Sequence, residues 1–230
     1  MVGKVVAIIP ARKGSKRVEF KNKKFLGKVP LIEWTFQAAF KHSMIDKVVV
    51  TTDDLEIIKL AGCYNFDSIK REKSLCTDTA TTADVVLDVL NQYPDFQTFI
   101  LLQPTSPFRN AGDISGSLQM YRDAFGCRSL VSACVEDHSP LWSFQIDCEG
   151  CLKFLGDPSD MKAQSQSLPK FYKLNGAIFV RGVKDFIRNP KFVEKESLCY
   201  EMPVSRSLDI DTLLDFRFAE ALIETGYSNC

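Results

Sequence analysis

Residues 4–28 read KVVAIIPARKGSKRVEFKNKKFLGK. The stretch begins with an apolar, mostly β-branched run at 5–9, and a loop containing Gly14 and Ser15 follows. It carries nine Lys or Arg and one acid, Glu19, although the whole chain has 29 residues of each sign. A strand that ends in a basic, flexible loop can hold phosphate, because backbone N–H groups and cations point at the same ligand. The opening therefore indicates a nucleotide or polyphosphate ligand.

Apolar strands and amphipathic helices alternate beyond this opening. Up to residue 134, strands are expected at 5–9, 47–51, 98–102 and 129–134, and helices at 30–41, 53–61, 81–93 and 112–124. After residue 171 we expect a strand at 174–180 and helices at 183–188 and 212–225. Strands that are apolar throughout and separated by helices imply a parallel sheet covered on both faces. The chain is predicted to form one doubly wound, mostly parallel α/β domain over residues 1–230.

The rhythm changes between residues 138 and 171. Two runs, 141–147 and 151–155, are typical of an antiparallel hairpin, and a polar segment follows. This region is interpreted as a flexible insertion or as an arm that folds against a second subunit. Cys148 and Cys151 flank Glu-Gly, which is interpreted as the hairpin turn rather than as half a zinc site.

Composition excludes several classes of protein. The net charge is zero, which argues against general nucleic-acid or membrane-surface binding. No apolar run approaches the ~18 residues of a membrane span, and the first residues do not resemble a signal peptide. The eight scattered cysteines are expected to be reduced, so a cytosolic location is predicted. With only two histidines, a His-dependent triad is disfavoured.

Polar clusters follow several of the expected strands. They lie at 12–16, 51–54, 103–109 and 209–211. Ligands of open α/β sheets bind beyond the carboxyl ends of the strands, so these clusters are expected to converge. In the first loop, Arg12, Lys16 and Lys21 are spaced to face one triphosphate. A loop cation is expected to be unpacked, so Lys21→Ala should damage turnover more than folding.

Three further features suggest chemistry. Asp209 and Asp211 present two carboxylates to one side of an extended segment while Ile210 turns into the core, which suits Mg²⁺. Gln103 stands at the mouth of a strand, where an amide can contact a base or sugar. Arg71 and the segment 77–82 (TDTATT) offer a cation and hydroxyls, although helix capping accounts for at least one threonine.

Five ordered motifs resemble the acylneuraminate cytidylyltransferases, the CMP-nonulosonic-acid synthetases. They are IIPARKGSKR…KN at 8–22, TTDD at 51–54, LLQPTSPFR at 101–109, KLNGAIFV at 173–180 and RSLDIDT at 206–212. The resemblance implies that the anomeric hydroxyl of an α-keto acid sugar attacks the α-phosphorus of CTP and releases pyrophosphate. It also implies a homodimer, with residues 138–171 as the dimerisation arm.

The resemblance also implies roles for individual residues. The implied catalytic residues are Arg12, Lys16, Lys21 and Asp211. The nucleotide is implied to bind at Ala11, Arg12, Asn22, Arg71 and Thr82. The acceptor sugar is implied to bind at Gln103, Asn175 and Phe179, and Mg²⁺ at Asp209 and Asp211.

The chain departs from the family pattern at three positions. Lys13 replaces a glycine of the first loop, Ser165 stands where sialic-acid members carry an Arg, and Phe179 replaces a common Tyr. A less polar pocket would suit a legionaminic or pseudaminic acid better than N-acetylneuraminate. Two alternatives stay open: a nucleotide-sugar-binding module without turnover, and a nucleotidyltransferase for another sugar.

Overall fold

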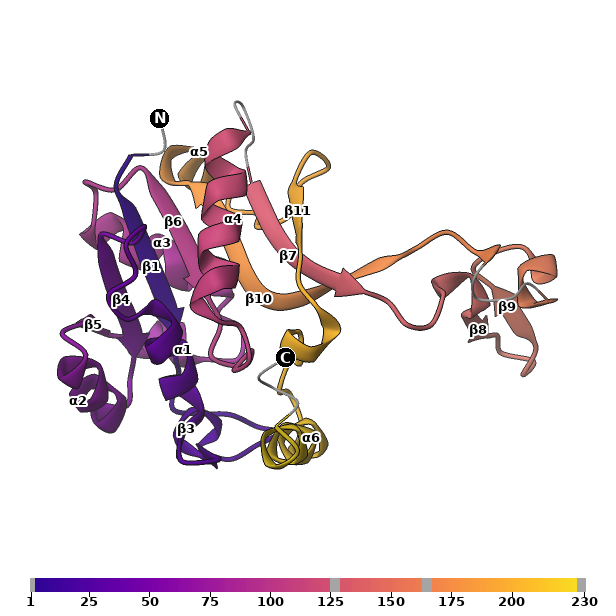
Figure 1. Ribbon diagram of the computed structural model, residues 1–230, viewed down its shortest axis with the longest axis horizontal. Helices are drawn as coiled ribbons and strands as arrows, with labels where there is room; N and C mark the ends of the chain where they lie inside the picture. The colour runs from indigo at the N-terminus through magenta and orange to yellow at the C-terminus, as the bar shows by residue number, and fades with distance from the viewer. Residues whose placement is uncertain (1–2, 125–128, 163–166, 227–230) are drawn as a thin grey trace.

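A seven-stranded mixed sheet forms the centre of the computed structural model, which describes residues 3–124, 129–162 and 167–226 (Figure 1). The strand order is β11-β7-β10-β6-β1-β4-β5. Their bounds are β1 Val5–Pro10, β4 Lys47–Thr52, β5 Asp67–Lys70, β6 Thr98–Leu102, β7 Ser129–Val135, β10 Tyr172–Gly182 and β11 Leu198–Glu201. Strand β10 runs antiparallel to both of its neighbours, and the other neighbouring pairs are parallel.

Helices cover both faces of the sheet, as the sequence predicts. One face packs against α1 (Leu31–Ala39), α2 (Leu55–Cys63) and α4 (Ala111–Asp123), and the other against α3 (Thr82–Gln92) and α5 (Val183–Arg188). Alternate side chains of a strand point to opposite faces. In β1, Val5, Ala7 and Ile9 join the first core while Val6 and Ile8 join the second, and all five are fully buried.

Reciprocal caps fix the starts of three helices. In each, the side chain of the residue before the helix accepts from an N–H of the first turn, and an Asp of that turn bonds back. The pairs are Thr81 with Asp84 (α3), Asn110 with Asp113 (α4) and Thr212 with Asp215 (α6, Leu213–Glu224). Thr81 therefore caps a helix, as expected for one threonine of the 77–82 segment. Helix α2 is capped by Asp54, whose carboxylate accepts from the Glu56 N–H at 2.9 Å.

The structure differs from the sequence prediction in the sheet. Strands β5 and β11 were not predicted, because each has only four residues and lies at a sheet edge. Strand β10 is antiparallel because the chain returns to the sheet from the 138–171 segment without a crossover helix (Figure 1). Its pairing with β7 shifts register between Leu174 and Phe179, which places a bulge within the strand.

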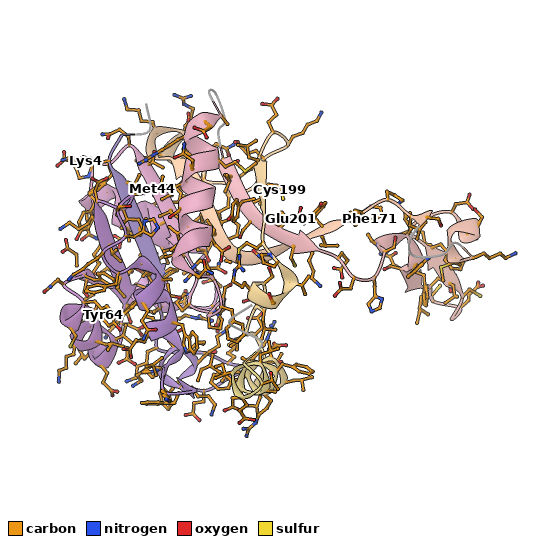
Figure 2. All side chains as sticks on the ribbon, in the orientation of Figure 1. Lys4, Met44, Tyr64, Phe171, Cys199 and Glu201 are labelled. Carbon is orange, nitrogen blue, oxygen red and sulfur yellow. The ribbon has the colours of Figure 1, made fainter. Side chains whose placement is uncertain are left out.

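The segment 138–171 extends away from the body as an arm (Figure 1). It contains η3 (Pro140–Trp142), the hairpin strands β8 (Phe144–Ile146) and β9 (Leu152–Phe154), and η4 (Pro158–Lys162). Phe171 lies at its neck, where its carbonyl accepts from the Glu136 N–H at 2.9 Å (Figure 2). The predicted hairpin is confirmed with shorter strands, and Gly150 turns it at φ 82°. Cys148 and Cys151 are exposed free thiols.

A second small hairpin joins the basic loop to the body. It consists of β2 (Phe25–Leu26) and β3 (Val29–Pro30), with Gly27 at φ 63°, and it packs with α6 around the buried side chains of Leu26 and Phe216. No helix within the described residues is both long enough and apolar enough to cross a membrane.

Candidate active site

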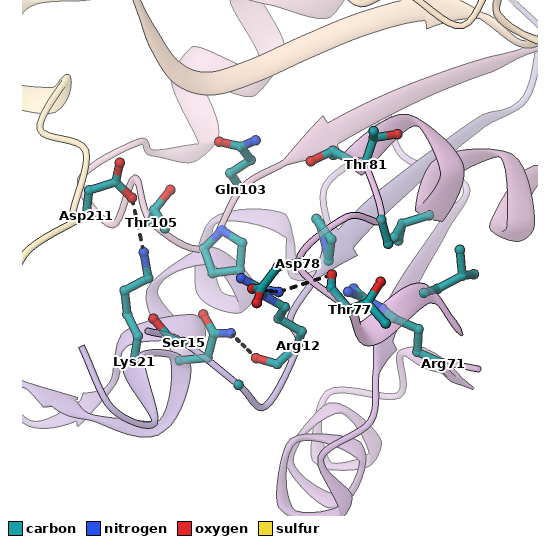
Figure 3. Close-up of a pocket in the computed structure, with 18 of the residues that line it drawn as sticks. Arg12, Ser15, Lys21, Arg71, Thr77, Asp78, Thr81, Gln103, Thr105 and Asp211 are labelled. Atoms are coloured by element: carbon teal, nitrogen blue, oxygen red, sulfur yellow. Dashed lines mark hydrogen bonds and ion pairs between the residues drawn. The ribbon is translucent and has the colours of Figure 1, made fainter. Parts of the chain in front are cut away.

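A cavity of about 400 Å³ opens at the carboxyl ends of β1 and β6, beside the start of α3 (Figure 3). It is lined by residues from the basic loop, the 71–85 segment, the loop after β6 and the segment before α6. Eight of the predicted site residues line it together: Arg12, Lys21, Asn22, Arg71, Thr82, Gln103, Asp209 and Asp211. The expected convergence of basic loop and carboxylates on one cleft is therefore present.

The basic loop is closed on itself at its base. The Asn22 amide donates to the Arg12 carbonyl at 3.1 Å, and the Lys13 N–H donates to Asp53 Oδ1 at 2.7 Å. The loop then passes into η1 (Lys21–Lys23), whose preceding residue Phe20 has φ 50°. These contacts hold Arg12 at the cavity wall.

Lys23 forms a second attachment of this loop. Its ammonium lies 3.1 Å from Asp54 Oδ2 and 3.0 Å from Glu56 Oε1, and Asp54 is buried. Lys23 is therefore paired with two carboxylates rather than free in solvent. The residues of the 51–54 cluster do not line the cavity. Instead, Asp53 and Asp54 each hold one end of the basic loop.

Arg71 forms a buried wall of the cavity. Its guanidinium donates to the Thr51 carbonyl at 2.8 Å and to the Thr51 hydroxyl at 3.3 Å, and the residue is 6% exposed. Burial lowers the pKa of Arg71 from its ordinary value. Leu75 and Val85 also line the cavity, so this part combines apolar surface with a cation.

The opposite wall carries the two carboxylates. Ile210 is fully buried in the core between the β2–β3 hairpin and α6. Its two neighbours in the sequence, Asp209 and Asp211, line the cavity. The Ile210 N–H donates to the Thr105 carbonyl at 2.8 Å, which fixes this segment to the loop after β6. The predicted geometry, with two carboxylates on one side and the isoleucine in the core, is confirmed.

Lys21 links the basic loop to the segment that carries the two carboxylates (Figure 3). Its ammonium donates to the Ile210 carbonyl at 2.8 Å and to Asp211 Oδ1 at 3.3 Å, and only 13% of its side chain is exposed. Arg17 contacts the other oxygen of Asp211 at 3.2 Å. The prediction of an unpacked cation is therefore wrong for Lys21.

Asp209 lines the cavity, and within the described part of the chain no ion pair involves it. Burial raises the pKa of Asp209 above its ordinary value, and the nearby charge of Asp211 raises it further. A hydrogen bond from Thr105 acts in the opposite direction but does not cancel these effects. Mg²⁺ commonly uses one or two carboxylates together with substrate phosphates. The pair Asp209 and Asp211 fits that donor set, and the described residues hold no group of three or more His, Cys, Asp or Glu that could bind a metal without substrate.

The loop after β6 is held from beneath by Arg109. This fully buried guanidinium donates to the carbonyls of Gln103 and Ala177 at 3.2 and 3.1 Å and to the Thr35 hydroxyl at 2.7 Å. Burial lowers the pKa of Arg109 to about 10, so the side chain stays charged near neutral pH. Arg109, which belongs to the 103–109 cluster, therefore supports the cavity wall from within the protein.

Gly176 of β10 brings the backbone close to Gln103 and Asp209. Its φ is 69°, and a Cβ at this position would lie 3.1 Å from Gln103 Oε1 and 3.5 Å from Asp209 Oδ2. The left-handed conformation therefore favours a glycine here, and an added Cβ would also crowd the Gln103 side chain.

Four residues with predicted roles do not line the cavity. Lys16 is exposed and pairs with Asp78, and Ala11 is buried beyond the end of β1, where its N–H donates to the Thr51 carbonyl. Phe179 packs on Phe192, with ring centroids 5.3 Å apart.

Asn175, the fourth, is an internal residue. It is 3% exposed, and its amide bonds to the hydroxyls of Ser132 at 2.6 Å and Ser207 at 2.9 Å and to the Ala177 N–H at 3.2 Å. These bonds join β7, β10 and the segment that leads to Asp209. The structure thus gives Asn175 a supporting place, and Ser165 lies outside the described residues.

Thr105 and Asp78 also line the cavity, and neither was singled out from the sequence. Thr105 lies in the Gln103–Arg109 loop, and Asp78 lies in the TDTATT segment next to Arg12. Their motifs were recognised, but a loop conformation decides which side chain of a motif faces the cavity.

The sheet, its strand order and the position of the cavity define a class of α/β proteins that bind ligands at the strand ends. The fold is shared with a solved structure of CMP:2-keto-3-deoxy-manno-octonic acid synthetase complexed with CTP, at a TM-score of 0.75 and 16% identity, over 97% of this chain and 100% of that one. A 4-diphosphocytidyl-2C-methyl-D-erythritol synthase from Anaerococcus prevotii has a TM-score of 0.69 and 15% identity, over 96% of each chain.

Residues 6–141 match the family model described as Cytidylyltransferase, and the chain belongs to that family. It is 34% identical to the CMP-N,N'-diacetyllegionaminic acid synthase of Legionella pneumophila, over 96% of this chain and 97% of the relative. It is 34% identical to the N-acylneuraminate cytidylyltransferase of Escherichia coli, over 94% of this chain, but spans about half (51%) of that protein's length. Identity to the pseudaminic acid cytidylyltransferase of Campylobacter jejuni is 30%, over 98% and 99%.

Proposed function

We propose that this protein transfers CMP from CTP to the anomeric hydroxyl of a nonulosonic acid. The observation that carries the proposal is the single cavity shared by the cations Arg12 and Lys21 and the carboxylates Asp209 and Asp211. Membership of the cytidylyltransferase family supports the proposal, as does the similarity to three enzymes named for nonulosonic acids.

In the proposed reaction, the sugar oxygen forms a bond to the α-phosphorus and the bond from that phosphorus to the β-phosphate oxygen breaks. Pyrophosphate leaves with the electron pair, and the hydroxyl proton passes to a base that we do not assign. Arg12, Lys16 and Lys21 would balance the negative charge of the phosphates, and Asn22, Arg71 and Thr82 would contact the nucleotide. Gln103 is the residue we expect at the sugar.

A divalent cation, proposed to be Mg²⁺, would be held by Asp209 and Asp211 and would neutralise phosphate charge when bound. The two acids favour an enzyme over a pure binding module, because carboxylates beside a triphosphate repel it unless a cation intervenes. The third possibility, another sugar or nucleotide, is separated by the choice of substrates in the assay.

The assay measures pyrophosphate release with each of the four nucleoside triphosphates and with N-acetylneuraminic, legionaminic and pseudaminic acids. We expect release with CTP and a nonulosonic acid, and faster turnover with legionaminic or pseudaminic acid. A clear preference for N-acetylneuraminate would refute the sugar assignment. Absence of release with every pair, in a protein that binds CTP, would favour the binding module.

We further propose that two copies of the chain form a homodimer through the arm. It exposes an apolar set on its hairpin and beyond: Phe144, Ile146, Leu152, Leu155 and Met161. An exposed apolar surface of this kind on a projecting arm is typical of a protein interface. Sedimentation equilibrium should give twice the mass of 25.9 kDa, and Ile146→Lys with Leu152→Lys should reduce it to the monomer mass. A monomeric wild-type protein at micromolar concentration would contradict the proposal.

A further inference from the structure

Two cations of the basic loop, Arg12 and Lys16, converge on one carboxylate, that of Asp78. Figure 3 shows Arg12 beside Asp78. Oδ1 of Asp78 accepts from Arg12 Nη1 at 3.1 Å, and Oδ2 lies 2.6 Å from Lys16 Nζ. Arg12 also donates to the carbonyl of the preceding residue, Thr77, at 3.3 Å. The contacts with Lys16 and then Arg12 lower the pKa of Asp78, so its carboxylate is charged at neutral pH.

A carboxylate and a phosphate make the same demands on these cations. Each presents two oxygens with negative charge, and each forms charge-assisted hydrogen bonds with guanidinium and ammonium groups. Arg12 and Lys16 are therefore arranged to bridge a single anion.

We propose that Asp78 is an internal competitor for the cations that bind phosphate, and that it weakens the binding of triphosphate and pyrophosphate by this chain. The inference rests on the proposed function, which assigns Arg12 and Lys16 to the phosphates. It adds a residue that sets the affinity, since each phosphate that reaches these cations must displace the carboxylate.

The surroundings of Asp78 allow this exchange. About half of its side chain (49%) is exposed, and it lies in the connection between η2 (Lys73–Cys76) and α3, outside the buried core. The carboxylate can therefore turn into solvent without exposing apolar surface. After the reaction, its return to Arg12 and Lys16 would favour departure of pyrophosphate over retention.

The test is calorimetric titration of the full chain with inorganic triphosphate and with inorganic pyrophosphate, each with and without Mg²⁺. Asp78→Asn removes the charge and keeps the shape. Two exposed ion pairs are worth little, so we expect binding about threefold to tenfold tighter for both anions. Asp78→Glu keeps the charge and should stay within about twofold of wild type.

Glu72→Gln is the matched control. Glu72 is exposed in the same part of the chain, and among the described residues no ion pair with the basic loop involves it. Removing the charge of Glu72 tests whether any loss of negative charge nearby tightens anion binding. An equal gain in affinity in Glu72→Gln and Asp78→Asn would overturn the proposal. Unchanged or weaker binding by Asp78→Asn would also overturn it, and weakening only with Mg²⁺ would assign Asp78 to the metal instead.

These outcomes are separate from a failure of the proposed function. If wild type binds triphosphate and turns over CTP while Asp78→Asn binds no tighter, only the competition is wrong. If wild type turns over no nucleotide yet Asp78→Asn binds triphosphate more tightly, the competition stands and the reaction is wrong.

Discussion

Replacing Lys21 by methionine tests how far one side chain supports both folding and function. Methionine keeps most of the apolar stem, so the change removes mainly the ammonium and its two contacts. A hydrogen bond from a charged donor to a carbonyl is worth about 1.5–3 kcal/mol, and here it links Lys21 to Ile210 at 2.8 Å. The contact with Asp211, whose side chain is 54% exposed, adds at most about 1 kcal/mol.

We therefore expect the free energy of unfolding of Lys21→Met to fall by about 2–3 kcal/mol. For a chain of 230 residues this corresponds to a melting temperature lower by roughly 4–12 °C. Urea denaturation followed by circular dichroism gives the free energy, provided that the m-value is unchanged. Triphosphate affinity should fall in the same variant, because a cavity cation is lost.

Lys28→Met is the control, since Lys28 lies on the same loop system but is exposed. It should stay within about 0.5 kcal/mol of wild type. If Lys21→Met were as stable as Lys28→Met, the contact with the Ile210 carbonyl would contribute nothing and the link between the two walls of the cavity would be refuted.

Three further variants test other parts of the site. Asp211→Asn should abolish divalent-dependent pyrophosphate release with little change in melting temperature; near-normal turnover would remove the metal assignment. Asp54→Ala should lose about 1 kcal/mol of stability from the α2 cap beyond the loss in Asp54→Asn, measured by urea denaturation. Burial alone would raise the pKa of Asp54, but the contacts with Lys23 and the Glu56 N–H lower it below its ordinary value. The carboxylate therefore contributes to the free energy of unfolding above pH 3.8, and this contribution is lost as the pH falls further. The difference in stability between wild type and Asp54→Asn should close at that low pH. Asn175→Ala should cost about 2–4 kcal/mol of stability, since the three buried hydrogen bonds of its amide with Ser132, Ser207 and the Ala177 N–H are lost; a raised KM for the sugar at unchanged stability would instead restore the predicted sugar contact.

The predicted fold and the positions of the cavity residues depended on different kinds of information. Apolar runs such as 5–9 and 98–102 predicted buried strands to within a residue, because burial on both faces leaves a continuous apolar signal. The four-residue edge strands β5 and β11 carry no such signal, and the sense of β10 depends on the path of the arm.

At the site, the sequence by itself determined which residues could carry charge and which pair of acids would share one side of a segment. Spacing along an extended chain is a local property, so Asp209 and Asp211 followed from it. Contacts between distant segments are not local. Only the tertiary structure decided that Lys21 is packed against Ile210 and that Asn175 is internal, because each outcome depends on where another part of the chain comes to lie.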